Sequence, residues 1–125
     1  MKRIMLADDD ATIRLLVNAT LRGDEYELFE ASDGEETLLR AREIHPDLIL
    51  LDIGMPKIDG IEVCRVLKGN EATNDIKVII LTARAQEHDR QRAHDAGAEG
   101  YFTKPFSPLA LLNRISQVLD GTPDS

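Results

Sequence analysis

Residues 48–56 read LILLDIGMP, four apolar residues followed by an aspartate and a turn. An unbroken apolar run of this length predicts a strand that is buried on both faces, as in the middle of a parallel sheet. Gly54 and Pro56 favour a turn directly after it. Asp52 therefore stands where a buried strand reaches water. It either marks only the end of that strand or carries chemistry, and the ends of the other apolar runs decide between these interpretations.

Strand-like and helix-like segments alternate along the chain. The predicted strands are residues 4–7, 26–31, 48–51, 78–81 and 101–102. The second of them alternates apolar and polar residues, which predicts an outer, half-exposed strand beside the first. The predicted inward faces of the helices are Ile13, Leu16, Val17 and Leu21; Leu38, Ala41 and Ile44; Ile61, Cys64 and Leu67; Ala93 and Ala96; and Leu111, Leu112, Ile115, Val118 and Leu119. The alternation predicts an α/β fold, a doubly wound parallel sheet of five strands with five helices on its two faces, in three layers.

Local signals set the ends of the helices. Capping residues mark three helix starts, at Asp10, Asp59 and Ser107. The helix before the central strand is expected to end at His45, because a residue that precedes proline, here Pro46, avoids the helical conformation. The helix over residues 87–96 is very polar, with Ala93 and Ala96 as its only evident inward anchors. We expect this helix to be weakly held and mobile.

Composition narrows the class of protein. A chain of 125 residues with 42% hydrophobic residues fits one domain, which we expect over residues 1–120, followed by a polar tail or the start of a linker over 121–125. The net charge of -8 argues against direct binding to nucleic acid or to an anionic membrane. The single cysteine, Cys64, has apolar neighbours and is predicted to be a reduced core residue. No apolar run approaches the roughly 20 residues that span a bilayer, so we expect a cytoplasmic protein.

Polar side chains follow four of the five predicted strands: Asp8 and Asp9, Asp52, Thr82, and Lys104. Parallel strands of such a sheet bind ligands beyond their carboxyl ends, so these side chains are expected to converge. Clustered carboxylates repel one another, and Mg²⁺, which prefers oxygen ligands, relieves that repulsion. An aspartate beside the metal can act as the nucleophile in phosphoryl transfer. The threonine hydroxyl and the lysine ammonium are suited to stabilising the transferred group.

Four short motifs occur in a fixed order on this pattern: Asp8-Asp9, Asp52 with Met55-Pro56, Thr82-Ala83, and Lys104-Pro105. With them the chain resembles a two-component response-regulator receiver domain, of the chemotaxis receiver type, over essentially its whole length. The resemblance implies a flavodoxin-like sheet in the strand order 2-1-3-4-5. It implies a signalling switch and not an enzyme, although such a switch assists its own phosphoryl transfer and dephosphorylation.

The resemblance also implies how the site works. Asp52 would accept a phosphoryl group from a sensor histidine kinase or a phosphotransfer protein in a reaction that depends on Mg²⁺. Asp8, Asp9, Asp52 and the backbone carbonyl of Gly54 would hold the metal. Lys104 would pair with the phosphoryl group and would be joined to Pro105 by a cis peptide bond.

The resemblance also implies which residues pass the signal to a partner. Thr82 and Tyr101 would form the switch pair, and residues 87–119 would present a surface to an output domain, a protein partner or a second copy of the chain. Some regulators of this kind dimerise through charged residues on that surface. Gly100 and Leu109 stand where an aspartate and an arginine are common, which argues against this mode of dimerisation, whereas Arg114 remains and keeps a homodimer that depends on phosphorylation open.

Three other functions fit the sequence less well. A binding module that no longer uses phosphorylation would not need the complete set of aspartates, threonine and lysine. A magnesium-dependent phosphohydrolase would need a second aspartate two residues after Asp52, where Gly54 stands. A flavin-binding protein would need a phosphate loop after the first strand, where the aspartates at 8–10 would repel phosphate.

Overall fold

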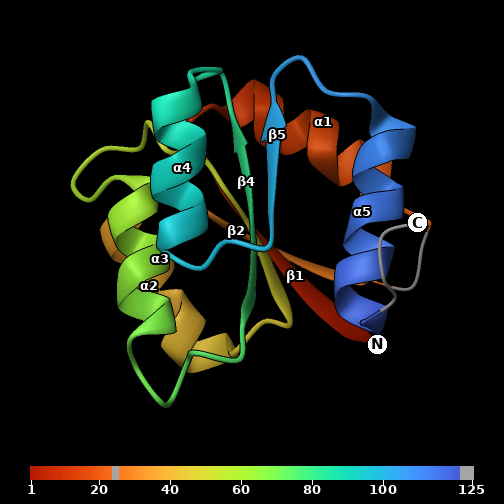
Figure 1. The fold of residues 1–125 in the computed structure, drawn as a ribbon. Helices are drawn as coiled ribbons and strands as arrows, with labels where there is room; N and C mark the ends of the chain where they lie inside the picture. The colour runs from red at the N-terminus through yellow and green to blue at the C-terminus, as the bar shows by residue number, and fades with distance from the viewer. Residues whose placement is uncertain (24–25, 122–125) are drawn as a thin grey trace.

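The computed structural model describes residues 1–23 and 26–121. Its strands are β1 (Lys2–Ala7), β2 (Tyr26–Ala31), β3 (Leu48–Leu51), β4 (Lys77–Thr82) and β5 (Gly100–Thr103). Its helices are α1 (Ala11–Leu21), α2 (Gly34–Ile44), α3 (Gly60–Lys68), α4 (Glu87–Asp95) and α5 (Pro108–Asp120). Strands and helices alternate as predicted (Figure 1). The predicted tail at 121–125 lies, apart from Gly121, outside the described residues.

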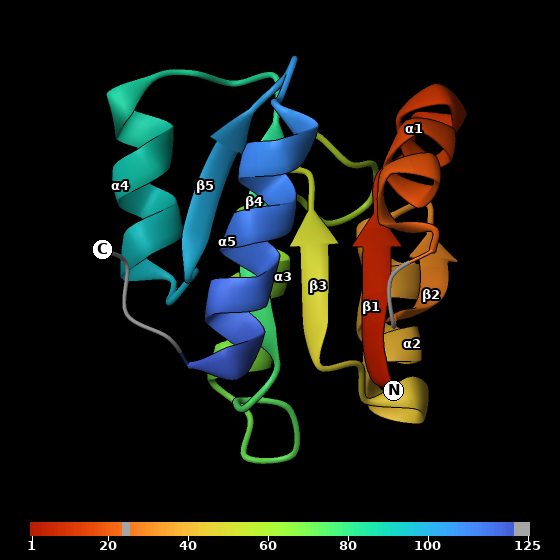
Figure 2. The ribbon, with the colours of Figure 1, turned by 90° about the vertical axis from the view of Figure 1, so that its right-hand side faces the viewer.

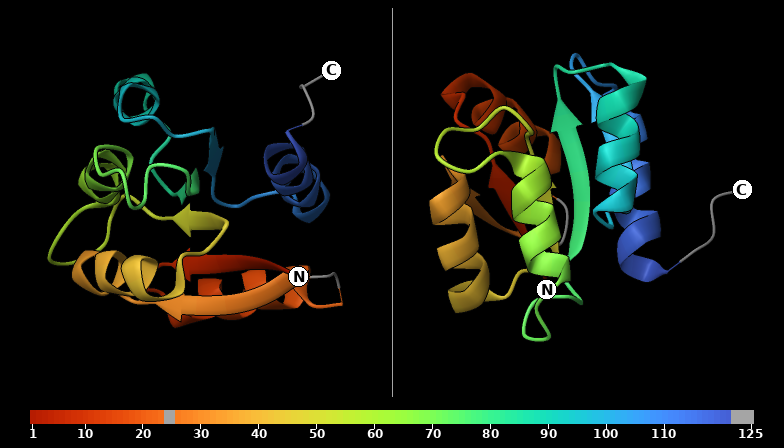
Figure 3. Two further views of the ribbon diagram at one scale, coloured as in Figure 1. Left: turned by 90° about the horizontal axis from the view of Figure 1, so that it is seen from below. Right: turned by 60° about the vertical axis from the view of Figure 1, so that its left-hand side comes forward.

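All five strands are parallel and stand in the order β2-β1-β3-β4-β5 (Figure 2). Helices α1 and α5 cover one face of the sheet, and α2, α3 and α4 cover the other; Figure 3 shows both layers from below. The predicted α/β class, the strand order and the three layers are thus confirmed. The reversal of strand order between β1 and β3 brings the carboxyl ends of these two strands side by side.

Strand β3 is the centre of both hydrophobic cores. Its four residues are fully buried, and they alternate between the two faces of the sheet. Ile49 and Leu51 pack in the core under α2, α3 and α4, whereas Leu48 and Leu50 pack in the core under α1 and α5. Burial of each of these side chains contributes about 1.5–3 kcal/mol. The unbroken apolar run in the sequence therefore reflects two cores that share one strand.

Side-chain caps fix the starts of most helices. Asp10, Asp33, Asp59 and Ser107 each accept a hydrogen bond from a backbone N–H in the first turn of α1, α2, α3 and α5. Helix α4 follows Gln86 and has no such side-chain bond. A missing cap removes about 1 kcal/mol of local stabilisation. This agrees with the expectation that α4 is held less firmly than its neighbours.

One detail of the predicted helices was wrong. Leu16 was expected on the inward face of α1, but 48% of it is exposed, and Val17 and Leu21 make the buried contacts. The predicted end of α2 is confirmed, because the helix ends at Ile44 and His45 leaves the right-handed helical conformation. His45 adopts a left-handed conformation (φ 51°) and donates its N–H to the carbonyl of Ala41, which caps the helix.

Helix α4 has one inward anchor that the sequence did not reveal. Ala93 and Ala96 are buried as predicted, but Asp89 is buried as well, with 7% exposure.

The single cysteine, Cys64, is a buried core residue of α3, as predicted. Its Sγ atom donates to the carbonyl of Ala96 at 3.5 Å. Burial raises the pKa of the Cys64 thiol to about 11, so the thiol is protonated and unreactive at neutral pH.

Glu99, in the connection between α4 and β5, is held in place by hydrogen bonds to three other elements. Its backbone N–H donates to the carbonyl of Val78 at 2.7 Å, and its side chain accepts from the N–H of Val78 at 2.8 Å. The Nζ atom of Lys68 donates to the other oxygen of the same carboxylate at 2.8 Å, and Arg114 donates to the Glu99 carbonyl. Elements α3, β4 and α5 therefore all hold the residue that precedes β5.

None of the helices within residues 1–23 and 26–121 has the length and apolar character that a bilayer crossing requires.

Candidate functional site

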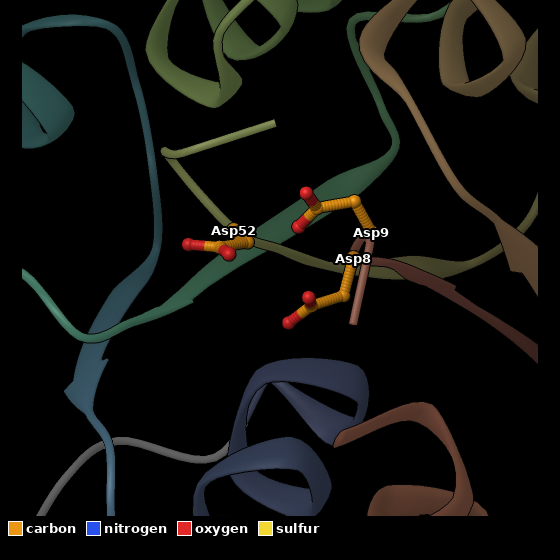
Figure 4. A group of neighbouring side chains, drawn as sticks. All are labelled: Asp8, Asp9 and Asp52. Atoms are coloured by element: carbon orange, nitrogen blue, oxygen red, sulfur yellow. The ribbon is translucent and has the colours of Figure 1, made fainter. Parts of the chain in front are cut away.

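Three carboxylates meet at the carboxyl end of the sheet (Figure 4). Ala7 and Leu51 are paired in register on β1 and β3, so the residues that follow them, Asp8 and Asp52, leave the sheet next to each other. The backbone N–H of Asp52 donates to the carbonyl of Ala7 at 3.0 Å, which continues the pairing by one step. One oxygen from each of Asp8, Asp9 and Asp52 lies within 4.8 Å of the others. The parallel register thus builds the predicted acidic cluster.

A lysine that follows the edge strand β5 joins the cluster of carboxylates. Lys104 follows β5, and its Nζ atom lies 2.7 Å from Oδ2 of Asp8 and 3.4 Å from Oδ2 of Asp52. Its backbone N–H donates to the carbonyl of Thr82 at 2.8 Å, and its peptide bond to Pro105 is cis, as predicted. The ammonium group of Lys104 therefore forms ion pairs with both carboxylates, and Asp8 is the closer partner.

Burial and charge pairing oppose each other in setting the pKa values of Asp8 and Lys104. Asp8 is 1% exposed, and burial raises its pKa, although hydrogen bonds from Lys104 and from the backbone of Asp10 oppose that shift. For Lys104, burial alone would lower the pKa, but the hydrogen bond to Asp8 and the charge of Asp52 outweigh it, and the pKa is raised. Lys104 is therefore a cation at neutral pH, and an added positive charge near Asp8 would favour the ionised form of its carboxyl group.

The donors fit a hard divalent cation. All the nearby ligand atoms are carboxylate oxygens, and Asp9 is exposed while Asp8 and Asp52 are buried, so the cluster has one open side. Gly54, whose N–H lies 3.3 Å from Oδ1 of Asp52, is exposed and has no side chain that could cover the cluster. Mg²⁺ takes one or two carboxylates and keeps several waters, which needs such an opening.

Gly60, the first residue of α3, shapes the loop after Asp52. A Cβ atom at Gly60 would lie 2.1 Å from the backbone oxygen of Asp52, so any other residue there would push α3 away from the site. The N–H of Gly60 donates to the carbonyl of Ile53 at 2.9 Å. The close approach of α3 holds the loop that carries Asp52.

Thr82 and Tyr101 meet at one residue of the β4–α4 loop. The N–H of Arg84 donates to Oγ1 of Thr82 at 3.4 Å, and the hydroxyl of Tyr101 donates to the carbonyl of Arg84 at 2.8 Å. The guanidinium of Arg90 lies 4.7 Å from the centre of the Tyr101 ring, a cation–π contact. Burial, followed by the charge of Asp89, raises the pKa of Tyr101, which keeps its hydroxyl protonated.

The structure thus unites part of the predicted set. Asp8, Asp9, Asp52 and Lys104 form the cluster, and Thr82 adjoins it through its backbone bond to Lys104. The two predicted switch residues, Thr82 and Tyr101, are linked through hydrogen bonds to the backbone of Arg84. Gly54 donates its N–H to Oδ1 of Asp52 at 3.3 Å, while a metal contact from its carbonyl stays a prediction.

The family model of the response regulator receiver domain matches residues 4–116. The chain is a response regulator receiver domain.

Relatives and solved structures agree with this family. The phosphate regulon transcriptional regulatory protein PhoB of Escherichia coli is 42% identical over 118 residues, which cover 94% of this chain and 52% of that protein. RpaA of Synechocystis, a DNA-binding transcriptional regulator, is 41% identical over 98% of this chain and 51% of its own length. A putative response regulator from Chloroflexus aurantiacus superposes with a TM-score of 0.90 at 31% identity, covering 95% of this chain and 98% of the other. The receiver domain spans about half the length of the curated relatives it matches.

Membership confirms the resemblance inferred from the motifs. Receiver domains of response regulators are phosphoacceptor signalling switches and are not generally classed as enzymes. The family binds Mg²⁺ at an acidic pocket, and this receiver domain has its acidic cluster at Asp8, Asp9 and Asp52.

Sequence reasoning missed one residue that touches the cluster. Arg14 of α1 donates from Nη1 to the backbone oxygen of Asp8 at 2.7 Å and from Nε to Glu30 at 2.7 Å. A signal was present, because a cation near the start of a helix faces the positive end of the helix dipole. Such a cation needs acceptors outside its own helix, here the Asp8 carbonyl and Glu30.

Proposed function

We propose that Asp52 is the phosphoacceptor of this receiver domain. The observation that supports it best is that the Asp52 carboxylate lies beside two further carboxylates and 3.4 Å from an ammonium group. A carboxylate oxygen attacks the phosphorus, the phosphorus–nitrogen bond of a phosphohistidine breaks, and the imidazole leaves. The donor would be a sensor histidine kinase or a phosphotransfer protein.

Asp8, Asp9, Asp52 and the carbonyl of Gly54 would hold Mg²⁺. When bound, the cation offsets the negative charge of the transferred group and of the carboxylates. Lys104 now pairs with Asp8 at 2.7 Å, and its shorter distance to Asp8 than to Asp52 means that it has to turn toward the phosphoryl group. Binding of a cation at Asp8 favours this exchange of partners, because Asp8 then no longer depends on Lys104 for compensation.

Thr82 and Tyr101 would change conformation in response to the phosphoryl group. It adds about -1.5 to -2 charges near Thr82, whose hydroxyl can donate to it. Thr82 would then release the N–H of Arg84, and the β4–α4 loop would move. Because the Tyr101 hydroxyl is bonded to the carbonyl of the same Arg84, that movement frees the ring to turn.

The surface that changes would be residues 87–119, facing an output domain, a protein partner or a second copy. We expect phosphorylation, or a phosphoryl mimic, to speed amide exchange in α4 and around Tyr101 more than in α2 or α3. Helix α4 lacks a side-chain cap, and the loop before it contains Arg84, the residue that Thr82 would release. Exchange measured by mass spectrometry with and without the mimic tests this. Changes confined to the loops around residues 8, 52 and 82 would contradict it.

Residues 1–120 would form the receiver domain, acting in the cytoplasm without direct contact to nucleic acid or membrane. The same side chains that promote phosphoryl transfer would also assist dephosphorylation, and Gly54 has no side chain that would exclude water from Asp52.

The direct test is phosphorylation by a small-molecule donor such as acetyl phosphate. We expect intact mass to increase by one phosphoryl group in millimolar Mg²⁺ and to stay unchanged in chelator. Mg²⁺ should also raise the melting temperature, because a ligand that binds only the folded state stabilises it. Uptake that is equal with and without chelator, together with an unchanged melting temperature, would refute the metal site.

A further inference from the structure

Arg14 is held between its own helix and the outer strand of the sheet. Its Nε atom donates to one carboxylate oxygen of Glu30 on β2 at 2.7 Å. The side chain of Asn18, one turn further along α1, donates to the other oxygen of Glu30 at 2.8 Å. The remaining contact of the guanidinium is the bond from Nη1 to the backbone oxygen of Asp8, also 2.7 Å. Glu30 and Asn18 thus fix the direction in which Arg14 reaches the site.

The backbone oxygen of Asp8 belongs to the peptide group that joins Asp8 to Asp9. The Asp8 side chain has supports of its own, because it accepts from the N–H of Asp10 at 2.9 Å and from Lys104 at 2.7 Å. The Asp9 side chain differs from that of Asp8, because it is exposed and, within residues 1–23 and 26–121, takes part in no hydrogen bond or ion pair. The direction of its carboxylate depends on the backbone that precedes it.

We propose that Arg14 is a positioning residue for the metal site: it orients the Asp8–Asp9 peptide so that the Asp9 carboxylate faces the space it shares with Asp52. The inference rests on the proposed Mg²⁺ site. A guanidinium suits this task, because its planar fork holds two acceptors in fixed directions. Arg14 therefore acts on the affinity for Mg²⁺ and not on the transfer of the phosphoryl group.

The test is the dissociation constant for Mg²⁺, measured by titration calorimetry on unphosphorylated protein. We expect Arg14→Met to weaken Mg²⁺ binding about tenfold, the range typical for residues that orient metal ligands. Glu30→Gln should weaken it less, and Arg14→Lys should recover part of the loss, because an ammonium can reach one of the two acceptors. At saturating Mg²⁺, phosphorylation of Arg14→Met by acetyl phosphate should proceed at the wild-type rate.

The matched control is Arg3→Met. Arg3 pairs with Glu27 of β2, with Nε and Oε1 3.3 Å apart, and donates to the carbonyl of Ile44 at 2.8 Å. These are contacts of the same kind at the opposite end of β1 and β2. Arg3→Met should keep wild-type affinity for Mg²⁺ even where it lowers the melting temperature.

Unchanged Mg²⁺ affinity in folded Arg14→Met, or an equal loss in Arg3→Met, would overturn the positioning role while leaving the proposed function intact. If Arg14→Met does not fold, Glu30→Gln decides: weaker binding supports the role and wild-type binding overturns it. If the wild-type protein itself binds no Mg²⁺, the proposed metal site fails, and the positioning role fails with it.

Discussion

Asp52→Asn is expected to abolish phosphorylation while leaving the fold intact. An amide is not a nucleophile toward phosphorus, but its oxygen can still accept the N–H of Gly54, as Oδ1 of Asp52 does. Removal of one charge from a cluster of carboxylates relieves repulsion, so without metal the free energy of unfolding should rise by about 1 kcal/mol. Intact mass after treatment with acetyl phosphate and Mg²⁺ measures the first effect, and urea unfolding in chelator measures the second.

Asp47→Asn is the matched control, since Asp47 directly precedes β3 at its other end and accepts the N–H of Arg3 at 2.8 Å. This variant should take up one phosphoryl group, and hydroxylamine should release it, as expected for an acyl phosphate. Phosphoryl uptake by Asp52→Asn at the wild-type rate would show that another residue is the acceptor.

Lys104→Met is expected to cause the largest loss of stability. It leaves the Asp8 carboxylate, 1% exposed, without the partner that lies 2.7 Å away. Removing one member of a buried ion pair costs about 3 kcal/mol. The pKa of Asp8, already raised by burial, would rise further. The folded state then binds a proton more tightly than the unfolded chain, so stability falls as pH rises from the unfolded value of 3.8 through the raised one.

Urea unfolding in chelator, at pH 4.5 and at pH 8, measures this effect. The loss relative to wild type should be larger at pH 8, where Asp8 has to ionise. The double variant Asp8→Asn with Lys104→Met should recover most of the stability and lose the pH dependence, because no orphaned carboxylate remains. A loss that is the same at both pH values and persists in the double variant would contradict this account. Lys104→Met should still accept a phosphoryl group but should fail to alter amide exchange in α4.

Periodicity and chain order were sufficient to predict much of the fold and of the acidic cluster. A strand buried on both faces has to be apolar throughout, and residues 48–51 satisfy this. Parallel strands bring their carboxyl ends to one edge, so side chains far apart in sequence, such as Asp8 and Lys104, could be expected to meet. Both inferences follow from geometry that every sheet of this class shares.

The remaining details depend on neighbours that a one-dimensional pattern does not specify. Leu16 and Val17 are both apolar, and only the position of the neighbouring elements decides that Val17 is covered and Leu16 is not. Asp89 lies on a helix without apolar periodicity, so the sequence pattern could not predict that its side chain is buried. Arg14 resembles a surface arginine until its acceptors on β2 and on the β1–α1 loop are known. Such contacts are tertiary, and they join residues through space.

The anchoring of Glu99 has a consequence for how receivers of this kind can diversify. Because Glu99 is bonded to Val78, Lys68 and Arg114, the end of the α4–β5 connection would stay fixed during the proposed movement of α4. Gly97, with φ of 99°, lies between the helix and this anchor and can absorb the change in direction. The outer face of α4 is thereby separated from the sheet that carries the chemistry. Substitutions on that face can accumulate over evolution and redirect the signal to new recipients, while the phosphoacceptor machinery is inherited unchanged.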